Sequence, residues 1–97
     1  MINIKNDMTD SLLKAILTLE TVEECYKFFE DVCTVKEIKA IAQRLEVARM
    51  LKNKQLYSKI VSDTGASTAT ISRVNRSLMY GSEGYDIVFS RLEEENK

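Results

Sequence analysis

The chain has 97 residues, a formal net charge of −1, and no histidine, tryptophan or proline. This length suits one domain, and no run approaches the roughly 18 apolar residues of a membrane span. The first residues, MINIKNDMTD, lack the basic and then apolar pattern of a secretory signal. We therefore expect a cytoplasmic protein.

The two cysteines, Cys25 and Cys33, lie eight residues apart. Without a histidine or a third cysteine they do not make a zinc site, and we expect reduced thiols that pack in the interior. Acid–base catalysis also lacks its usual groups, because the sequence shows no histidine, no glycine-rich phosphate loop and no carboxylate pair in a plausible pocket. The sequence predicts no enzyme, no metal site and no cofactor.

Charge is distributed unevenly along the chain. Residues 1–35 carry three basic and seven acidic side chains, residues 36–77 nine basic and three acidic, and residues 78–97 two basic and five acidic. A basic middle section between acidic ends can bind a polyanion on one face. Charges that only solvate helix surfaces would give the same pattern, so charge by itself leaves both interpretations open.

Apolar spacing is helical along nearly the whole chain, which predicts an all-α protein of six helices. The first short helix should follow Thr9 or Asp10. Two capping boxes come next, TVEE at 21–24 and TVKE at 34–37. In each, the threonine should cap the helix and the glutamate should reach back to the cap amide.

The second box opens the longest helix, which should end near Asn53 in a left-handed conformation. Its apolar stripe comprises Ile38, Ile41, Ala42, Leu45, Ala48 and Leu51. Short helices at 56–63 and 67–78 follow, and Gly81 should end the second through a positive φ. Ser82 should cap the last helix, whose apolar side comprises Tyr85, Val88, Phe89 and Leu92.

The stretch YSKIVSDTGASTATISRV, residues 57–74, predicts two helices that meet at a sharp turn on Gly65. The side chains expected to point inward are Ile60, Val61, Ala66, Ile71 and Val74. The second helix should then expose Ser67, Thr68, Ala69, Ser72, Arg73 and Arg76.

These exposed residues are suited to duplex DNA. Short hydroxyls and Ala69 would let the helix enter the major groove, where Ser and Thr bond to phosphates or base edges. Lys52, Lys54 and Lys59 are near in sequence and would contact phosphates. A helical protein-interaction module that has lost DNA binding is the alternative. A basic surface around residues 67–76 would favour DNA, and an apolar one a protein partner.

Residues 34–78, TVKEIKAIAQRLEVARMLKNKQLYSKIVSDTGASTATISRVNRSL, resemble the Trp repressor family, and more closely its YerC/YecD group. R-L-E-V-A precedes the turn at the family's distance, with one residue fewer in the loop, and G-A-S-T-A-T-I-S-R follows its recognition-helix pattern. The resemblance implies a six-helix fold with a helix-turn-helix and an intertwined homodimer. Residues 1–55 and 82–95 would form the dimerisation core of a single domain, and 56–78 the DNA-reading head.

The resemblance also implies a function, that of a sequence-specific transcription regulator that acts as a repressor. The DNA contacts would fall on Thr68, Ala69 and Ser72, with Lys59 on a phosphate. The partner would be a palindromic operator whose half-sites lie about one helical turn apart.

In the family, an amino-acid effector lies between the long helix and the recognition helix. The polar positions that match this pocket are Thr34, Arg44, Thr70, Arg73 and Ser77. Val74 stands where the tryptophan-binding repressor has glycine, and its methyl groups would take space that an indole needs. We expect weak or no tryptophan binding. A structural role for Arg44 and Arg73, bonding helix carbonyls or acidic neighbours such as Glu46, is the alternative.

Overall fold

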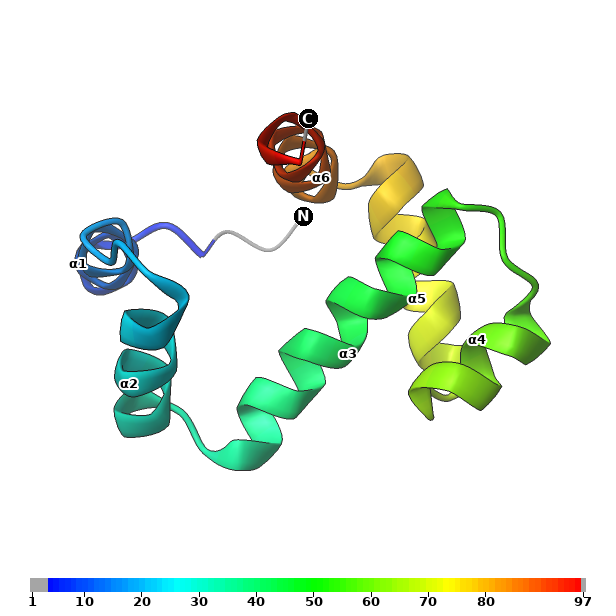
Figure 1. Ribbon diagram of the computed structural model, residues 1–97, viewed down its shortest axis with the longest axis horizontal. Coiled ribbons are helices and arrows are strands. Elements are labelled where there is room, and N and C mark those ends of the chain that lie inside the picture. The colour runs from blue at the N-terminus through cyan, green and yellow to red at the C-terminus, as the bar shows by residue number, and fades with distance from the viewer. Residues whose placement is uncertain (1–3, 97) are drawn as a thin grey trace. The chain divides into compact units, whose positions relative to one another are not determined.

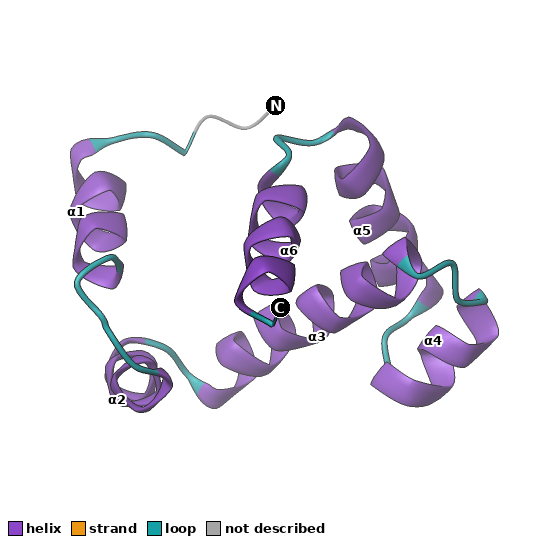
Figure 2. Ribbon diagram, turned by 45° about the horizontal axis from the view of Figure 1, so that its top comes forward, coloured by secondary structure: helices purple, strands orange, loops and turns teal. Residues whose placement is uncertain are grey.

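The computed structural model describes residues 4–96, which contain six helices and no strand (Figures 1 and 2). The helices are α1 (Asp7–Ile16), α2 (Val22–Val32), α3 (Val35–Lys52), α4 (Tyr57–Thr64), α5 (Thr68–Tyr80) and α6 (Gly84–Glu95). The chain divides into two compact units, the first ending at Ile38 and the second beginning at Lys39. Along the described residues, no helix is both long enough and apolar enough to cross a membrane. The all-α prediction is confirmed.

In the first unit, α1 begins earlier than the apolar spacing predicts. Asn6 is the N-cap, because its side-chain Oδ1 accepts a hydrogen bond of 2.7 Å from the amide of Thr9. Asparagine is among the best N-cap residues, so it starts the helix at Asp7 rather than after Thr9 or Asp10. Polar capping chemistry, not the first apolar residue, sets this boundary.

The two expected capping boxes differ in detail. At the start of α3, the amide of Glu37 donates to Thr34 Oγ1 at 3.1 Å, and the amide of Thr34 donates to Glu37 Oε1 at 2.8 Å. These bonds to Thr34 also hold the pKa of Glu37 below its ordinary value. At α2 the Thr21 cap forms, but Glu24 accepts from the amide of Glu20 rather than from that of Thr21. The second box is complete and the first is displaced by one residue.

The core of the second unit comes from three helices and the turn that joins two of them. Its buried side chains are Val47, Ala48, Met50, Ile60, Ala66, Ile71 and Val74. Leu51, Leu78, Tyr85 and Phe89 pack against this cluster and are partly buried. Ile60, Ala66, Ile71 and Val74 point inward as predicted, but Val61 does not, because its side chain remains 38% exposed.

The apolar stripe of α3 is only partly buried. Ala48 lies in the core, whereas Ile41 and Leu45 are 56% and 40% exposed. Val47 and Met50, outside the predicted stripe, are buried instead. The C-terminal part of α3 packs against α4 and α5. Where helices cross, the crossing geometry selects which face of α3 is buried, and the apolar periodicity of its sequence does not specify that face.

The remaining differences concern left-handed residues. After α3, Lys54 rather than Asn53 has the positive φ, at 59°. Gly81 ends α5 with a φ of −84°, and Glu83, at 67°, occupies the N-cap position of α6 in place of Ser82. Gly81 is nevertheless required, because a β-carbon there would collide with the backbone carbonyl of Ser77.

Candidate nucleic-acid interface

The turn between α4 and α5 is fixed by Gly65 and Thr64. Gly65 has φ 73° and ψ 5°, a left-handed conformation that glycine adopts without steric cost, and its amide donates to the carbonyl of Val61. Thr64 Oγ1 donates to the carbonyl of Ile60 at 2.7 Å and accepts from the amide of Ala66 at 3.1 Å. The side chain of Thr64 therefore bridges the end of α4 and the start of the turn.

Gln43 connects α3 to this turn. Its Nε2 donates to the carbonyl of Thr64 at 3.1 Å. Because the carbonyls of the last helical turn have no partner within the helix, the amide satisfies one that would otherwise need water. The turn is thus attached to α3 by a hydrogen bond as well as by the apolar core.

Ser67 and Thr70, both among the predicted site residues, form the start of α5. Ser67 is the N-cap, and its Oγ accepts from the amide of Thr70 at 3.1 Å. Its hydroxyl also lies 3.1 Å from Oγ1 of Thr70. Both hydroxyls therefore have a structural role in beginning the helix, whatever else they contact.

We define the α5 polar face by five predicted residues that remain exposed in the structure: Thr68, Ala69, Ser72, Arg73 and Arg76. Ser67 is exposed beside them. Within residues 62–78 no large apolar side chain is exposed; the nearest such chains are Val61 before this stretch and Met79 after it. The face is therefore polar and basic, formed by side chains of which only the two arginines are long.

Lys59, the predicted phosphate contact, lies in the first turn of α4 and forms an ion pair. Its Nζ is 3.1 Å from Oδ2 of Asp63, in the last turn of the same helix. The two side chains are 56% and 45% exposed, so solvent screens the pair and an incoming anion can reach the ammonium group.

The residues predicted for an effector pocket are divided between the two units. Thr34 belongs to the first unit, where it caps α3, and the hydroxyl of Thr70 is bonded to Ser67. Arg44, Arg73 and Ser77 are exposed. Among residues 4–96, neither arginine has a hydrogen-bonding or ionic partner, so the structural role proposed for them through Glu46 is not observed.

Glu46 pairs instead with Arg49, one turn along α3. The guanidinium donates to both carboxylate oxygens, and this hydrogen bonding lowers the pKa of Glu46. Burial and the negative charge of Asp63 act in the opposite direction on this pKa.

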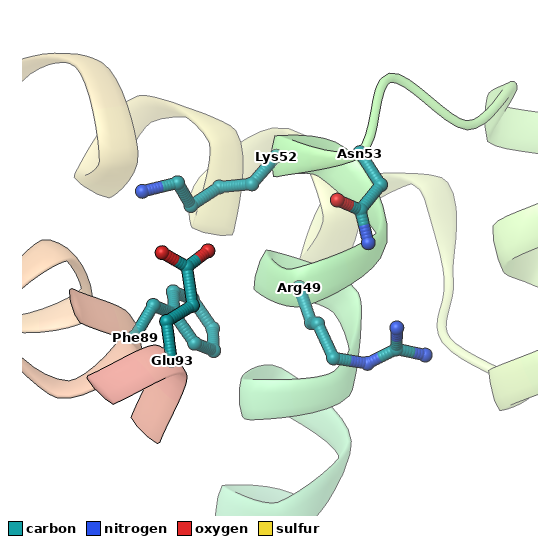
Figure 3. Close-up of a pocket in the computed structure, with 5 residues that line it drawn as sticks. All are labelled: Arg49, Lys52, Asn53, Phe89 and Glu93. Atoms are coloured by element: carbon teal, nitrogen blue, oxygen red, sulfur yellow. The ribbon is translucent and has the colours of Figure 1, made fainter. Parts of the chain in front are cut away.

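A hollow of about 340 Å³ lies between the end of α3 and α6 (Figure 3). It is lined by Arg49, Lys52, Asn53, Phe89 and Glu93. Lys52 Nζ is 2.7 Å from Oδ1 of Asp86 and 5.7 Å from the centre of the Phe89 ring. Figure 3 shows Arg49 extending away from Phe89 and Glu93. Lys52, predicted to lie near the DNA surface, therefore has an ionic partner on α6.

A comparison with family models gives a match over residues 7–93 to the family described as Trp repressor protein. This range includes the α4–α5 pair and most of every helix. The chain belongs to the Trp repressor family. That family is one of transcription regulators and not of enzymes.

Relatives of this Trp repressor family member extend over nearly the whole chain. It is 55% identical over 85 residues to the uncharacterized protein YerC of Bacillus subtilis (strain 168), an alignment that covers 88% of this chain and 82% of YerC. The predicted similarity to the YerC group is confirmed.

Two crystal structures have the same fold. A TrpR-like protein from Eubacterium eligens ATCC 27750 superposes with a TM-score of 0.90 at 56% identity, over 93% of both chains. A candidate Trp repressor from Staphylococcus aureus superposes with a TM-score of 0.89 at 50% identity, over 93% of this chain and 90% of that one.

Three features of this region were not predicted from the family member's sequence. Val47 and Met50 pack in the core with side chains of α4 and α5. Gln43 donates a hydrogen bond to the turn, and Asp63 pairs with Lys59. Only the last has a sequence signal, because lysine and aspartate four residues apart on a helix are neighbours. The other two depend on how α3 crosses the α4–α5 pair.

Proposed function

We propose that this protein is a homodimeric transcription regulator, a repressor, that binds duplex DNA through α4, the Gly65 turn and α5. These elements form the helix-turn-helix, or reading head, of residues 56–78. The observation that carries the proposal is the α5 polar face, which is exposed and basic and has no large apolar side chain exposed within residues 62–78. The buried centre of a protein–protein interface is usually more apolar than this face. The large apolar side chains that residues 56–78 do expose, Leu56, Tyr57 and Val61, all precede the Gly65 turn.

Each side chain of the reading head has a distinct chemical task. Thr68, Ala69 and Ser72 are short enough to let α5 enter the major groove, and can contact base edges and the thymine methyl group. Arg73 and Arg76 reach farther, to guanine edges or phosphates. Ser67 combines its cap with a place at the groove edge, and Lys59 contacts a phosphate.

The proposed dimer is supported by apolar surface that the single chain leaves exposed. No residue of α1 or α2 is buried. In the second unit, Ile41, Leu45, Val88 and Leu92 are each at least 40% exposed. A second copy that covers these helices, within residues 1–55 and 82–95, would remove this surface from water and present two reading heads to a palindromic operator.

An effector would bind near Arg44 and Arg73, which have no ionic partner within residues 4–96. Two free guanidinium groups can hold a carboxylate. Thr70 and Ser77, which belong to the same unit as the two arginines, complete the proposed polar lining. A protein that binds DNA and carries no membrane-spanning helix in residues 4–96 would act in the cytoplasm.

Selection of duplex DNA from a random pool tests the function directly. Purified protein at physiological salt is incubated with the pool, with and without a mixture of amino acids. A palindrome recovered in both arms supports a constitutive regulator, and one recovered only with the mixture shows an effector-dependent regulator. No enrichment in either arm contradicts DNA binding and favours the protein-interaction module.

The contact face is tested with Arg73→Ala and Lys59→Ala. Both variants should weaken binding, and Lys59→Ala should also lower the slope of log affinity against log salt by about one, because one phosphate contact is lost. Lys27→Ala is the matched control, since Lys27 also forms an exposed i,i+4 ion pair but lies on α2. Unchanged affinity and slope in both test variants would remove this assignment.

A further inference from the structure

Asp63 is a chemical exception in the reading head. Residues 47–82 contain six basic side chains and a single acidic one, Asp63. It lies two residues before Gly65 and four before the α5 N-cap, next to the surface proposed to face DNA. A carboxylate at this place repels phosphates, so the proposed function alone does not explain it.

Helix stability explains it only in small part, because an exposed i,i+4 pair stabilises a helix only weakly. Asp63 lies in the last turn of α4, where a negative charge opposes the helix dipole, and its partner Lys59 lies in the first turn, where a positive charge opposes it. The order of the pair, lysine before the acid at i,i+4, is also the weaker one. The Glu23–Lys27 pair of α2 has the favourable order. Asp63 and Lys59 therefore occupy the ends of α4 that suit their charges least.

The geometry places the ammonium group of Lys59 in an ion pair with Asp63. Lys59 Nζ is 3.1 Å from Oδ2 of Asp63, and both side chains are about half exposed. A phosphate that approaches α4 can reach the exposed ammonium group, but one of its three N–H donors is already directed at the carboxylate. The Asp63 carboxylate partly neutralises the positive charge that Lys59 offers to the phosphate.

We propose that Asp63 limits the affinity of the reading head for duplex DNA by competing with the backbone phosphate for the Lys59 ammonium group. This inference rests on the proposed function. Because phosphate contacts carry no sequence information, the competition weakens binding to an operator and to unrelated duplex by the same factor. The reading head is thereby kept from binding all DNA tightly through charge alone.

The test is a double-mutant cycle on the full chain, with a fluorescently labelled random-sequence duplex as the probe. Anisotropy titrations at several salt concentrations compare the wild type, Asp63→Asn, Lys59→Ala and the double variant. Glu23→Gln is the matched charge control, because it removes one carboxylate from a more exposed i,i+4 pair and changes the net charge equally. Because Glu23 lies on α2, within the proposed dimerisation core, sedimentation first establishes that this variant has the same oligomeric state as the wild type. Melting curves confirm that each variant is folded; Asp63→Asn should melt no lower than the wild type.

Asp63→Asn should tighten binding about two- to five-fold, the range of an exposed ion pair, and should give a clearly smaller gain when Lys59 is already alanine. Glu23→Gln should leave the affinity unchanged. An unchanged affinity in Asp63→Asn, while the wild type binds, overturns the inference and leaves the proposed function intact. An equal gain in the Lys59→Ala background, or from Glu23→Gln, also overturns it, because repulsion or net charge would then be the cause. If the wild type binds no duplex, the proposed function and this inference fail together.

Discussion

The three glycines of this chain differ in whether the backbone requires glycine. Two of them are required, for different reasons, and the third is not. Gly65 has a positive φ, but a β-carbon there would meet no atom within 4 Å. Gly81 has an ordinary φ, but a β-carbon would collide with the backbone of Ser77. At Gly84, the first residue of α6, neither restriction applies. Gly65 is therefore required by its backbone conformation and Gly81 by the close approach of Ser77, whereas another residue could replace Gly84.

Substituting each glycine by alanine should separate these reasons. Gly65→Ala should cost about 1–2 kcal/mol, the penalty of a left-handed residue with a side chain. Gly81→Ala should cost about 1–3 kcal/mol, because the backbone must shift to relieve the overlap. Gly84→Ala should be neutral or gain up to about 1 kcal/mol through helix propensity. Urea unfolding measures all three, and a stabilised Gly65→Ala would contradict the assigned turn.

Val74 is the single residue on which the prediction of weak or no tryptophan binding depends. Its side chain is 2% exposed and lies in the core with Ile60 and Ile71, so the space beside α5 at this position is already filled. We expect calorimetric titration with tryptophan to show no binding at micromolar concentration. Val74→Ala is the companion titration, since it frees volume without altering charge. Micromolar affinity in the wild type would contradict the prediction.

At the scale of the element, α5 begins at a residue with two roles. Ser67 caps the helix and is also placed at the edge of the proposed DNA surface. The sequence predicted the exposed hydroxyl, but it did not distinguish a cap from a DNA contact, because both need the same oxygen. Two substitutions at this position can separate the roles.

Ser67→Ala should lower stability by about 1 kcal/mol through loss of the cap, and should leave most of the DNA affinity intact. Ser67→Asp should keep the cap, because aspartate caps as well as serine, but should weaken DNA binding by placing a carboxylate against phosphates. Thermal melting and anisotropy titration measure the two effects. If Ser67→Asp binds DNA like the wild type, Ser67 lies outside the contact surface.

The helix boundaries show the same distinction between local and tertiary causes. Thr34 and Glu37 form the capping box as predicted, because every partner lies within four residues. The start of α6 was predicted wrongly, since its N-cap residue is Glu83 and not Ser82. The positive φ expected at Gly81, at the end of α5, also falls on Glu83. Because α6 must return to pack against the core beside α3, tertiary packing selects which residue of the α5–α6 connection takes the left-handed conformation. No local sequence signal specifies that residue.

At the scale of the whole molecule, the surface of the single chain points to a second copy. Ile41, on α3, is 56% exposed although it belongs to the predicted apolar stripe. The protein should therefore sediment as a dimer, and Ile41→Glu should shift it toward monomer and weaken operator binding, because two linked heads bind more tightly than one.

Helix content should survive in Ile41→Glu, since the substituted position is already in water in the single chain. Lys39→Gln is the control on the same helix, with the same change in net charge. Sedimentation of both variants beside the wild type measures the effect. A fully dimeric Ile41→Glu would place the dimer contacts elsewhere.

The sequence by itself determined the helical class, the Gly65 turn and the Ser67 start of α5. These depend on contacts between residues a few positions apart, on backbone freedom and on apolar period, which a linear pattern records. The family followed from the resemblance of residues 34–78 to known motifs. Tertiary structure decided that Val47 and Met50, rather than Ile41 and Leu45, face the core, that Gln43 bonds to the turn, and that Val61 stays exposed. A helix can bury any of several faces, and only the crossing of α3 with α4 and α5 selects one.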